Sequence, residues 1–189
     1  RISGSSCFDI ASKVLRNTKG NHIDFSSKKS HTASLAIVFD GQIVDEVLVT
    51  IFKGPHSYTG DHTLEISCHG SLYIQQRMLE LFTQAGARLA EPGEFTMRSF
   101  LNGKMDLSQA EAVADLIASD AEGAHQLAIQ QLRGGFSNEI KAMREELIQF
   151  AALIELELDF SEEDVEFANR EQLLNSVSSL QDKLNRLIS

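Results

Sequence analysis

Two charged positions in this sequence of 189 residues have a setting that suits ligand binding. The first is Glu65, which lies between Leu64 and Ile66 in a short β-like run, so strand alternation points it away from both neighbours. If its own face lines a pocket, the carboxylate can accept two parallel hydrogen bonds from a planar donor pair, such as the N–H/NH₂ edge of a pterin. If Leu64 and Ile66 face the core and the other face meets water, Glu65 is an ordinary solvated side chain, as most glutamates are. The pattern by itself leaves both interpretations open.

The second position is Lys104. It follows Gly103 in a break between two helical patterns, which brings its ammonium group close to the start of the second helix. A cation and a helix N-terminus at one place favour the binding of an anion. Most lysines are exposed without such a role, so a surface lysine is the alternative.

Segment 53–70 holds the densest set of polar side chains, but it has no recognisable metal or catalytic motif. Its potential metal ligands are His56, Asp61, His62, Cys68 and His69. Their spacing matches neither paired C-x-x-C nor H-x-x-x-H, and no G-x-S-x-G elbow surrounds a serine. The whole chain also lacks G-x-x-x-x-G-K-[ST] and G-x-G-x-x-G. The sequence therefore predicts no metal ligand and no catalytic residue in this chain.

Charge divides the chain into two parts. The formal net charge is −10, yet residues 1–107 hold eleven basic and eleven acidic residues, whereas residues 108–189 hold six basic and sixteen acidic ones. Affinity for nucleic acid comes largely from Lys and Arg on the phosphate backbone. We therefore expect the acidic second part to bind nucleic acid poorly.

The overall composition is that of a soluble globular protein, with 42% apolar and 23% charged residues. The longest apolar runs, at 35–39 and 150–154, are too short to span a bilayer, and no signal-peptide pattern occurs. Two cysteines, Cys7 and Cys68, make no disulfide framework, which is typical of a reducing compartment. We expect a cytoplasmic protein with no membrane contact.

The elements that must position Glu65 belong to a part in which helical and β-like patterns alternate. The strongest local signal is Asp40-Gly41 between two β-like runs, which predicts a hairpin. The expected elements are a helix at 8–15, strands at 33–39, 42–52 and 63–68, a helix from Ser71 to a stop at Gly86, and a further short strand at 88–90.

After residue 103 the period is helical throughout. Ser108 and Glu111 fit a capping box, with Ser108 as the N-cap of a helix. Gly134-Gly135 is a stop between two later helices.

Two apolar stripes follow, at 137–158 and 173–187, separated by an acidic stretch. Their near-heptad spacing predicts helices that pack nearly antiparallel in a bundle. The fold class we predict is an α+β domain at 1–103 followed by an all-α helical domain at 104–189.

Five blocks of the sequence resemble those of one family. They are Arg-Ile-Ser-Gly at 1–4, Ser-Tyr-Thr-Gly-Asp at 57–61, Leu-Glu-Ile-x-x-His-Gly at 64–70, Pro-Gly-Glu-Phe-Thr-x-Arg-x-Phe-Leu-Asn-Gly-Lys-x-Asp-Leu-x-Gln-Ala-Glu at 92–111, and Asp-Phe-x-Glu-Glu at 159–163. Their order and spacing agree along nearly the whole chain, and the 92–111 block is the most specific. The chain resembles the MnmE family, also called TrmE, of bacterial and organellar tRNA-modification GTPases.

The resemblance implies a domain plan. Residues 1–103 would be a tetrahydrofolate-binding and dimerisation domain, similar to the folate-binding part of glycine-cleavage aminomethyltransferases and lacking its first strand. Residues 104–189 would be a partial helical domain. An inserted Ras-like GTPase domain and a terminal cysteine motif would follow in the family and are absent from this chain. The apolar stripes should then lack partners that the returning chain supplies.

The resemblance also implies a function. The family, with the flavoprotein partner MnmG, installs a carboxymethylaminomethyl or aminomethyl group on C5 of the wobble uridine of certain tRNAs. Its cofactors are 5-formyl- or 5,10-methylene-tetrahydrofolate and, in the GTPase domain, GTP with Mg²⁺ and K⁺. The 189 residues alone would form a homodimer and bind the folate without catalysing a reaction. The alternative is a scaffold that dimerises and binds no folate.

Carried over by matching motifs, the family's folate contacts fall on Arg1, Glu65 and Lys104. Glu65 would be a buried carboxylate that accepts from the pterin edge. Arg1 and Lys104 would offer positive charge to a formyl oxygen or a glutamyl carboxylate, without a division of roles between them. The sequence departs from the family at 60–62, where Gly-Asp-His replaces Gly-Glu-Asp, and at 69–71, where His-Gly-Ser replaces His-Gly-Gly.

Overall fold

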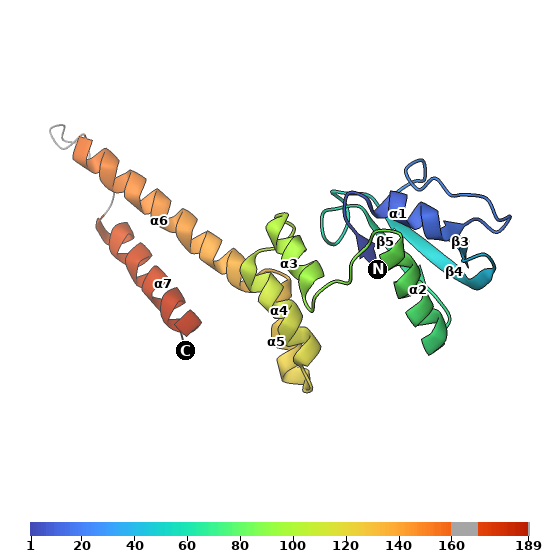
Figure 1. Ribbon diagram of the computed structural model, residues 1–189. Helices are drawn as coiled ribbons and strands as arrows, with labels where there is room; N and C mark the ends of the chain where they lie inside the picture. Colours follow the sequence, from blue (N-terminus) through green and yellow to red (C-terminus); the bar gives the residue numbers. More distant parts are fainter. Residues whose placement is uncertain (160–169, 189) are drawn as a thin grey trace. The chain divides into compact units, whose positions relative to one another are not determined.

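The computed structural model describes residues 1–159 and 170–188 (Figure 1). By its internal contacts the chain divides into two compact units, Arg1–Ala118 and Ser119–Ser189. The first combines helices with a sheet and the second is helical, which confirms the predicted order of an α+β part and an all-α part. No described helix has the length and apolar character needed to cross a membrane.

The described strands of the first unit form one antiparallel sheet in the order β1-β5-β4-β3-β2. They are β1 (Ile2–Ser3), β2 (Leu15–Arg16), β3 (Thr32–Phe39), β4 (Ile43–Phe52) and β5 (Thr63–Ser67). The backbone N–H of Asp40 donates to the carbonyl of Gln42 at 2.9 Å, which closes the β3–β4 turn. The predicted hairpin at Asp40-Gly41 is therefore confirmed.

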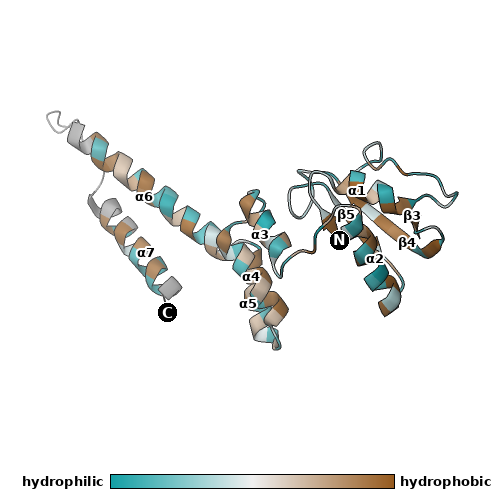
Figure 2. Ribbon diagram, in the orientation of Figure 1, coloured by the Kyte–Doolittle hydropathy of each residue, from teal (hydrophilic) through white to brown (hydrophobic). Residues whose placement is uncertain are grey.

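Helices α1 (Cys7–Val14) and α2 (Leu72–Gln84) cover one face of this sheet (Figure 1). Their buried side chains meet those of alternate strand positions in one hydrophobic core, and Figure 2 shows the hydrophobic residues on the strands beneath them. The largest fully buried members are Leu15, Phe25, Ile51 and Leu64. Helix α2 begins after Ser71 and ends before Gly86, where φ is +115°, as the sequence predicted.

The strand expected at 88–90 is wrong, since this described segment is irregular. The guanidinium of Arg88 donates to both carboxylate oxygens of Glu94, at 2.8 and 2.5 Å, and also to the carbonyl of Leu89. These bonds turn the segment toward α3 (Glu94–Leu101) instead of toward a sheet edge.

The N-cap expected at Ser108 is also wrong. Helix α4 (Leu107–Ala118) begins two residues earlier than a Ser108 cap would place it, and its capping box is made by Asp106 and Gln109. The backbone N–H of Gln109 donates to the Asp106 carboxylate at 2.9 Å, while the Gln109 side-chain oxygen accepts from the Asp106 backbone N–H at 3.0 Å. The capping box is therefore formed by an Asp and a Gln, two residues before the Ser and Glu of the predicted one.

The described helices of the second unit are α5 (Glu122–Leu132), α6 (Gly135–Asp159) and α7 (Arg170–Ile188). Gly134, with φ of +81°, separates α5 from α6, which confirms the predicted stop. Helix α7 returns beside α6 (Figure 1), and the ammonium of Lys183 lies 2.6 Å from the carboxylate of Glu146. The acidic stretch and the 159–163 block fall largely on residues outside those described.

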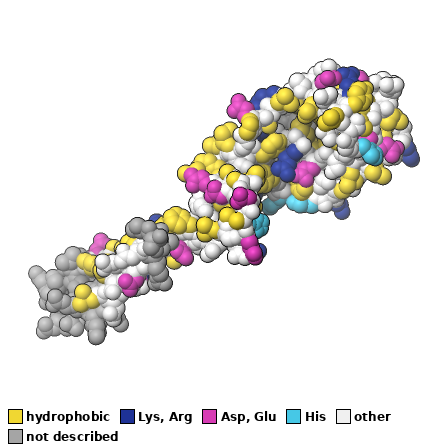
Figure 3. Space-filling model, turned by 90° about the horizontal axis from the view of Figure 1, so that it is seen from below, with side chains coloured by type: hydrophobic (Ala, Val, Ile, Leu, Met, Phe, Trp, Pro, Cys, Tyr) yellow, Lys and Arg dark blue, Asp and Glu magenta, His cyan; other side chains and the backbone are white. Residues whose placement is uncertain are grey.

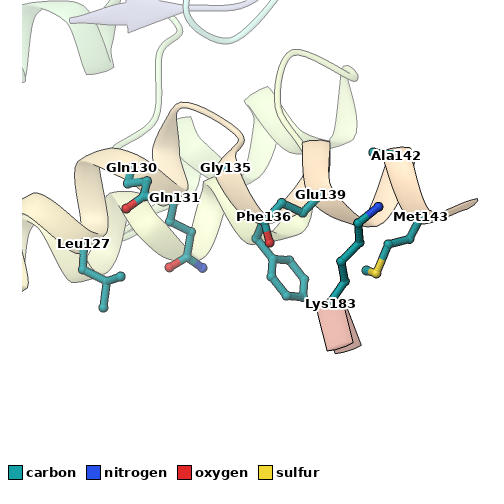
Figure 4. A pocket seen from close by; sticks show the side chains of 9 residues that line it. All are labelled: Leu127, Gln130, Gln131, Gly135, Phe136, Glu139, Ala142, Met143 and Lys183. Atoms are coloured by element: carbon teal, nitrogen blue, oxygen red, sulfur yellow. The ribbon is translucent and has the colours of Figure 1, made fainter. Parts of the chain in front are cut away.

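The apolar stripes of α6 and α7 are only partly covered. Met143 and Leu180 are buried and Phe150 is half-buried, whereas the stripe members Ile140, Leu147, Ile154, Val177 and Leu184 are exposed. A hollow of about 670 Å³ opens beside Met143, between the residues that Figure 4 labels. The exposure is what the sequence led us to expect.

Candidate functional site

The sheet register brings Arg1 and Glu65 together although 64 positions separate them. Ile2 pairs with Leu64 in the antiparallel β1–β5 ladder, so Arg1, the residue before Ile2, lies opposite Glu65. An Arg1 guanidinium nitrogen is 2.6 Å from a carboxylate oxygen of Glu65. On the other side of β5, Thr50 of β4 pairs with Glu65.

Glu65 is not the buried carboxylate that the sequence suggested. Its side chain is 40% exposed, and that of Arg1 is 39% exposed. The cause is alternation, since Leu64 is fully buried and Ile66 packs against the same core, which leaves Glu65 on the opposite face. The carboxylate is therefore accessible to a ligand, but it already holds a charged partner.

Two aromatic rings flank the Arg1 guanidinium, and neither was singled out from the sequence. The guanidinium carbon lies 5.4 Å from the ring centre of Tyr58 and 5.5 Å from that of Phe95. Both distances suit a cation–π contact. The available signal was their place in the blocks at 57–61 and 92–111, where they follow Ser57 and Glu94.

The loop that carries Tyr58 is held from several sides. The Tyr58 carbonyl accepts from the hydroxyl of Ser99 at 2.7 Å, and the Tyr58 hydroxyl lies 3.0 Å from that of Thr96. The side-chain amide of Asn102 donates to the carbonyl of Thr59 at 2.7 Å. Because Thr96, Ser99 and Asn102 belong to α3 or its end, these hydrogen bonds hold the loop against this helix.

Lys104 lies in the segment between α3 and α4, and its side chain approaches the same loop at Gly60. Its side chain is exposed, and a Cβ built on Gly60 would lie 3.5 Å from the Lys104 Cγ. Gly60 has φ of +84°, which favours glycine, and the lack of a side chain there leaves room for Asn102 and Lys104. Among the contacts of the described residues, Lys104 touches neither Arg1 nor Glu65.

Arg98 ties the start of the chain to this loop. Its guanidinium donates to the carbonyl of Ser3 at 3.2 Å and lies 3.0 Å from the carboxylate of Asp61. The hydroxyl of Ser3 in turn lies 2.7 Å from that of Thr59. These bonds fix the end of β1, and with it the backbone from which Arg1 extends.

Two histidines of segment 53–70 have structural partners. The carboxylate of Asp45 is buried and accepts from the backbone N–H of His69 at 3.0 Å and lies 2.7 Å from its ring Nδ1. Burial opposes ionisation, but these bonds and one from the Glu46 backbone N–H hold the pKa of Asp45 below its ordinary value. His62 stacks on Phe8 with ring centres 4.7 Å apart.

The described cysteines, histidines and acids form no cluster that suits a metal ion. Within residues 1–159 and 170–188, no three His, Cys, Asp or Glu side chains come together as metal ligands. Cys7 is buried, and burial raises the pKa of its thiol to about 12. Its thiol donates to the carbonyl of His62 at 3.1 Å.

An open groove of about 900 Å³ lies beside Arg1. Arg1 and Phe95 line it together with apolar side chains of α1 and α2, among them Ile10 and Met78, whereas Glu65 and Lys104 are not part of the lining. On the face in Figure 3, basic and acidic side chains are interspersed with hydrophobic ones instead of being gathered by sign.

Two family models match the chain. Residues 1–104 match that of the GTP-binding protein TrmE N-terminus, and residues 107–189 match that of the MnmE helical domain. Over all 189 residues the chain is 59% identical to the tRNA modification GTPase MnmE of Flavobacterium psychrophilum, 57% to that of Flavobacterium johnsoniae and 51% to that of Porphyromonas gingivalis. The chain spans 40% of the length of each of these relatives.

Proposed function

The chain belongs to the MnmE family of tRNA modification GTPases, and we propose that its first unit binds a reduced folate, 5-formyl- or 5,10-methylene-tetrahydrofolate, at Arg1, Glu65 and Lys104. The observation that carries this proposal is the Arg1–Glu65 pair at 2.6 Å. It unites, at one accessible point of the sheet, an acceptor for the pterin edge and a donor for an anionic or carbonyl oxygen.

The chemistry of the donor set fits a folate. The carboxylate of Glu65 can accept from the N–H and NH₂ groups of the pterin in two parallel bonds. When it does so, the guanidinium of Arg1 exchanges the carboxylate for an oxygen of the ligand. Lys104 supplies a second cation beside Gly60, suited to the glutamyl carboxylate.

The activity of the complete protein is a wider proposal. The relatives are named tRNA modification GTPases, and these 189 residues contain no phosphate-binding loop. We therefore assign GTP, Mg²⁺ and K⁺ to a GTPase domain outside them. With the flavoprotein MnmG, the cytoplasmic homodimer would modify the wobble uridine of tRNA, and the folate bound here would supply the one-carbon unit.

Calorimetric titration of the protein at its natural length with 5-formyl-tetrahydrofolate tests the folate site. Glu65→Ala removes the acceptor and should weaken binding about 10- to 100-fold, the value of roughly 1.5–3 kcal/mol for hydrogen bonds to a charged group. Glu46→Ala is the matched control, because Glu46 is exposed on β4 and alternation places it on the same face as Thr50 and Glu65. Equal affinities of the wild type and Glu65→Ala would contradict the proposal.

A dimerising scaffold without folate is the second candidate. The observation in its favour is the cross-strand pair Leu35 and Leu48, which lie opposite each other on β3 and β4 and are 64% and 43% exposed. Such a scaffold would be a dimer by sedimentation and would give no heat on addition of folate, whereas the first proposal requires binding.

A further inference from the structure

The environment of Arg1 contains more than its ion pair. The guanidinium is near one carboxylate and two aromatic rings, and these three partners come from separate segments: Glu65 from β5, Tyr58 from the loop before it and Phe95 from α3. A long, half-exposed arginine side chain would otherwise sample many rotamers, and this freedom must be lost for a directed hydrogen bond.

The rings are held independently of Arg1. Tyr58 is bound through its hydroxyl to Thr96 and through its carbonyl to Ser99. Phe95 follows Glu94, a buried carboxylate that accepts two bonds from Arg88 and one from the backbone N–H of Glu91. Bonds that do not involve Arg1 thus hold the Tyr58 side chain and the start of the helix that carries Phe95.

The two kinds of partner engage the Arg1 guanidinium differently, and this decides which of its N–H donors a ligand can use. A carboxylate occupies guanidinium N–H donors, whereas an aromatic face attracts the cation through its quadrupole and takes no conventional N–H bond. If a ligand engages the Glu65 carboxylate, Arg1 loses its charged partner but keeps both rings. The N–H donors then remain beside the ligand.

We propose that Tyr58 and Phe95 are positioning residues that hold the Arg1 guanidinium beside Glu65 and thereby set the affinity for the folate. This inference rests on the proposed folate site. It assigns the two rings a role through Arg1 and not a contact with the ligand, so their effect must depend on the presence of Arg1.

A double-mutant cycle tests this dependence, with affinity for 5-formyl-tetrahydrofolate measured by calorimetry on the natural-length protein. Phe95→Leu and Tyr58→Leu should each weaken binding about two- to fivefold, as expected for one cation–π contact at a partly exposed site. Tyr58→Phe keeps the ring and should change affinity less than twofold. In an Arg1→Ala background, Phe95→Leu should have no further effect.

The matched control is Phe100→Leu, the same change on the same helix, because among the described residues the rings that contact the Arg1 guanidinium are those of Tyr58 and Phe95. It should leave affinity unchanged. Thermal unfolding of each variant identifies a variant that fails to fold. If Phe95→Leu fails to fold, Tyr58→Leu measured with and without Arg1→Ala provides the same test, and it too should have no effect in the Arg1→Ala background.

The outcomes separate the two proposals. A wild-type protein that binds no folate overturns both the folate site and the positioning role. Binding that is weakened equally by Phe95→Leu with and without Arg1 overturns the positioning role and leaves the folate site standing. Loss of the Phe95 effect in Arg1→Ala, together with retained affinity in Tyr58→Phe, supports both.

Discussion

Replacing Asp45 by Asn should destabilise the first unit strongly although it removes no side-chain volume. Asp45 lies on β4 and is 8% exposed. One carboxylate oxygen faces the His69 ring at 2.7 Å and the Glu46 backbone N–H at 2.9 Å, while the other accepts from the His69 backbone N–H at 3.0 Å. Donors thus face both oxygens, so an amide NH₂ in either position meets a donor.

The magnitude follows from these contacts. A buried donor left without an acceptor costs about 1–3 kcal/mol, and loss of the charge weakens the remaining bonds by roughly 1 kcal/mol more. We expect Asp45→Asn to lower the free energy of unfolding by about 2–4 kcal/mol, or the melting temperature by about 8–16 °C for a unit of this size. The damage should extend to the candidate site, because His69 follows β5 and anchors the strand that carries Glu65.

The assay is thermal unfolding followed by circular dichroism at pH 7, with Asp40→Asn as control. Asp40 pairs with Arg77 near the surface and should contribute at most about 1 kcal/mol. Because the pKa of Asp45 is below its ordinary value of 3.8, its contribution is present above that value and is lost as the pH falls further. The difference between wild type and Asp45→Asn should therefore shrink in acid. The reasoning fails if the two Asn variants melt within a few degrees of each other at pH 7.

Two further changes test other contacts. The Arg88 guanidinium and the Glu91 backbone N–H lower the pKa of Glu94 from 4.5 to about 2, so the stability that this group contributes is present above pH 4.5 and is lost as the pH falls toward 2. The melting temperature of Glu94→Gln should therefore fall less than that of the wild type between pH 4.5 and 2. An equal fall in both proteins would contradict this. Asp106→Ala should lower the free energy of unfolding by about 1 kcal/mol, measured by urea unfolding, because it removes the N-cap of α4. Gln109→Ala removes the returning bond to the Asp106 backbone N–H but keeps the N-cap, and should lower it less; the reverse order would contradict the observed capping box.

Local chemistry was enough to predict much of the fold. Asp40-Gly41 has the conformational freedom that a tight hairpin requires, and Ser71 and Gly86 mark the ends of α2 by the usual capping preferences. At α4 the sequence contains two capping patterns, two residues apart, and the folded chain uses Asp106, through reciprocal bonds between the backbone N–H groups and side chains of Asp106 and Gln109. The strand expected at 88–90 was lost to a side-chain bond between Arg88 and Glu94 that no local pattern contains.

The candidate site was predictable in part. Glu65 was singled out by strand alternation and Lys104 by its place after a glycine, but the contact between Arg1 and Glu65 depends on the β1–β5 register. Tyr58 and Phe95 were missed because an aromatic residue in a sequence is more often part of a core, and their relation to Arg1 exists only in three dimensions. Whether these residues bind a folate stays a prediction.

The loop at 53–62 has no room for a side chain at Gly54, where it approaches Gly60. A Cβ on Gly54 would lie 2.5 Å from the carbonyl oxygen of Gly60, and the hydroxyl of Ser57 donates to the carbonyl of Asp61 across the same bend. His56, by contrast, is exposed at the outer side of the loop. A fluorophore attached through a cysteine introduced at position 56 would therefore report on the neighbourhood of Tyr58 without disturbing the contacts of Gly54 and Ser57. Position 56 is thus suited to a fluorescent label.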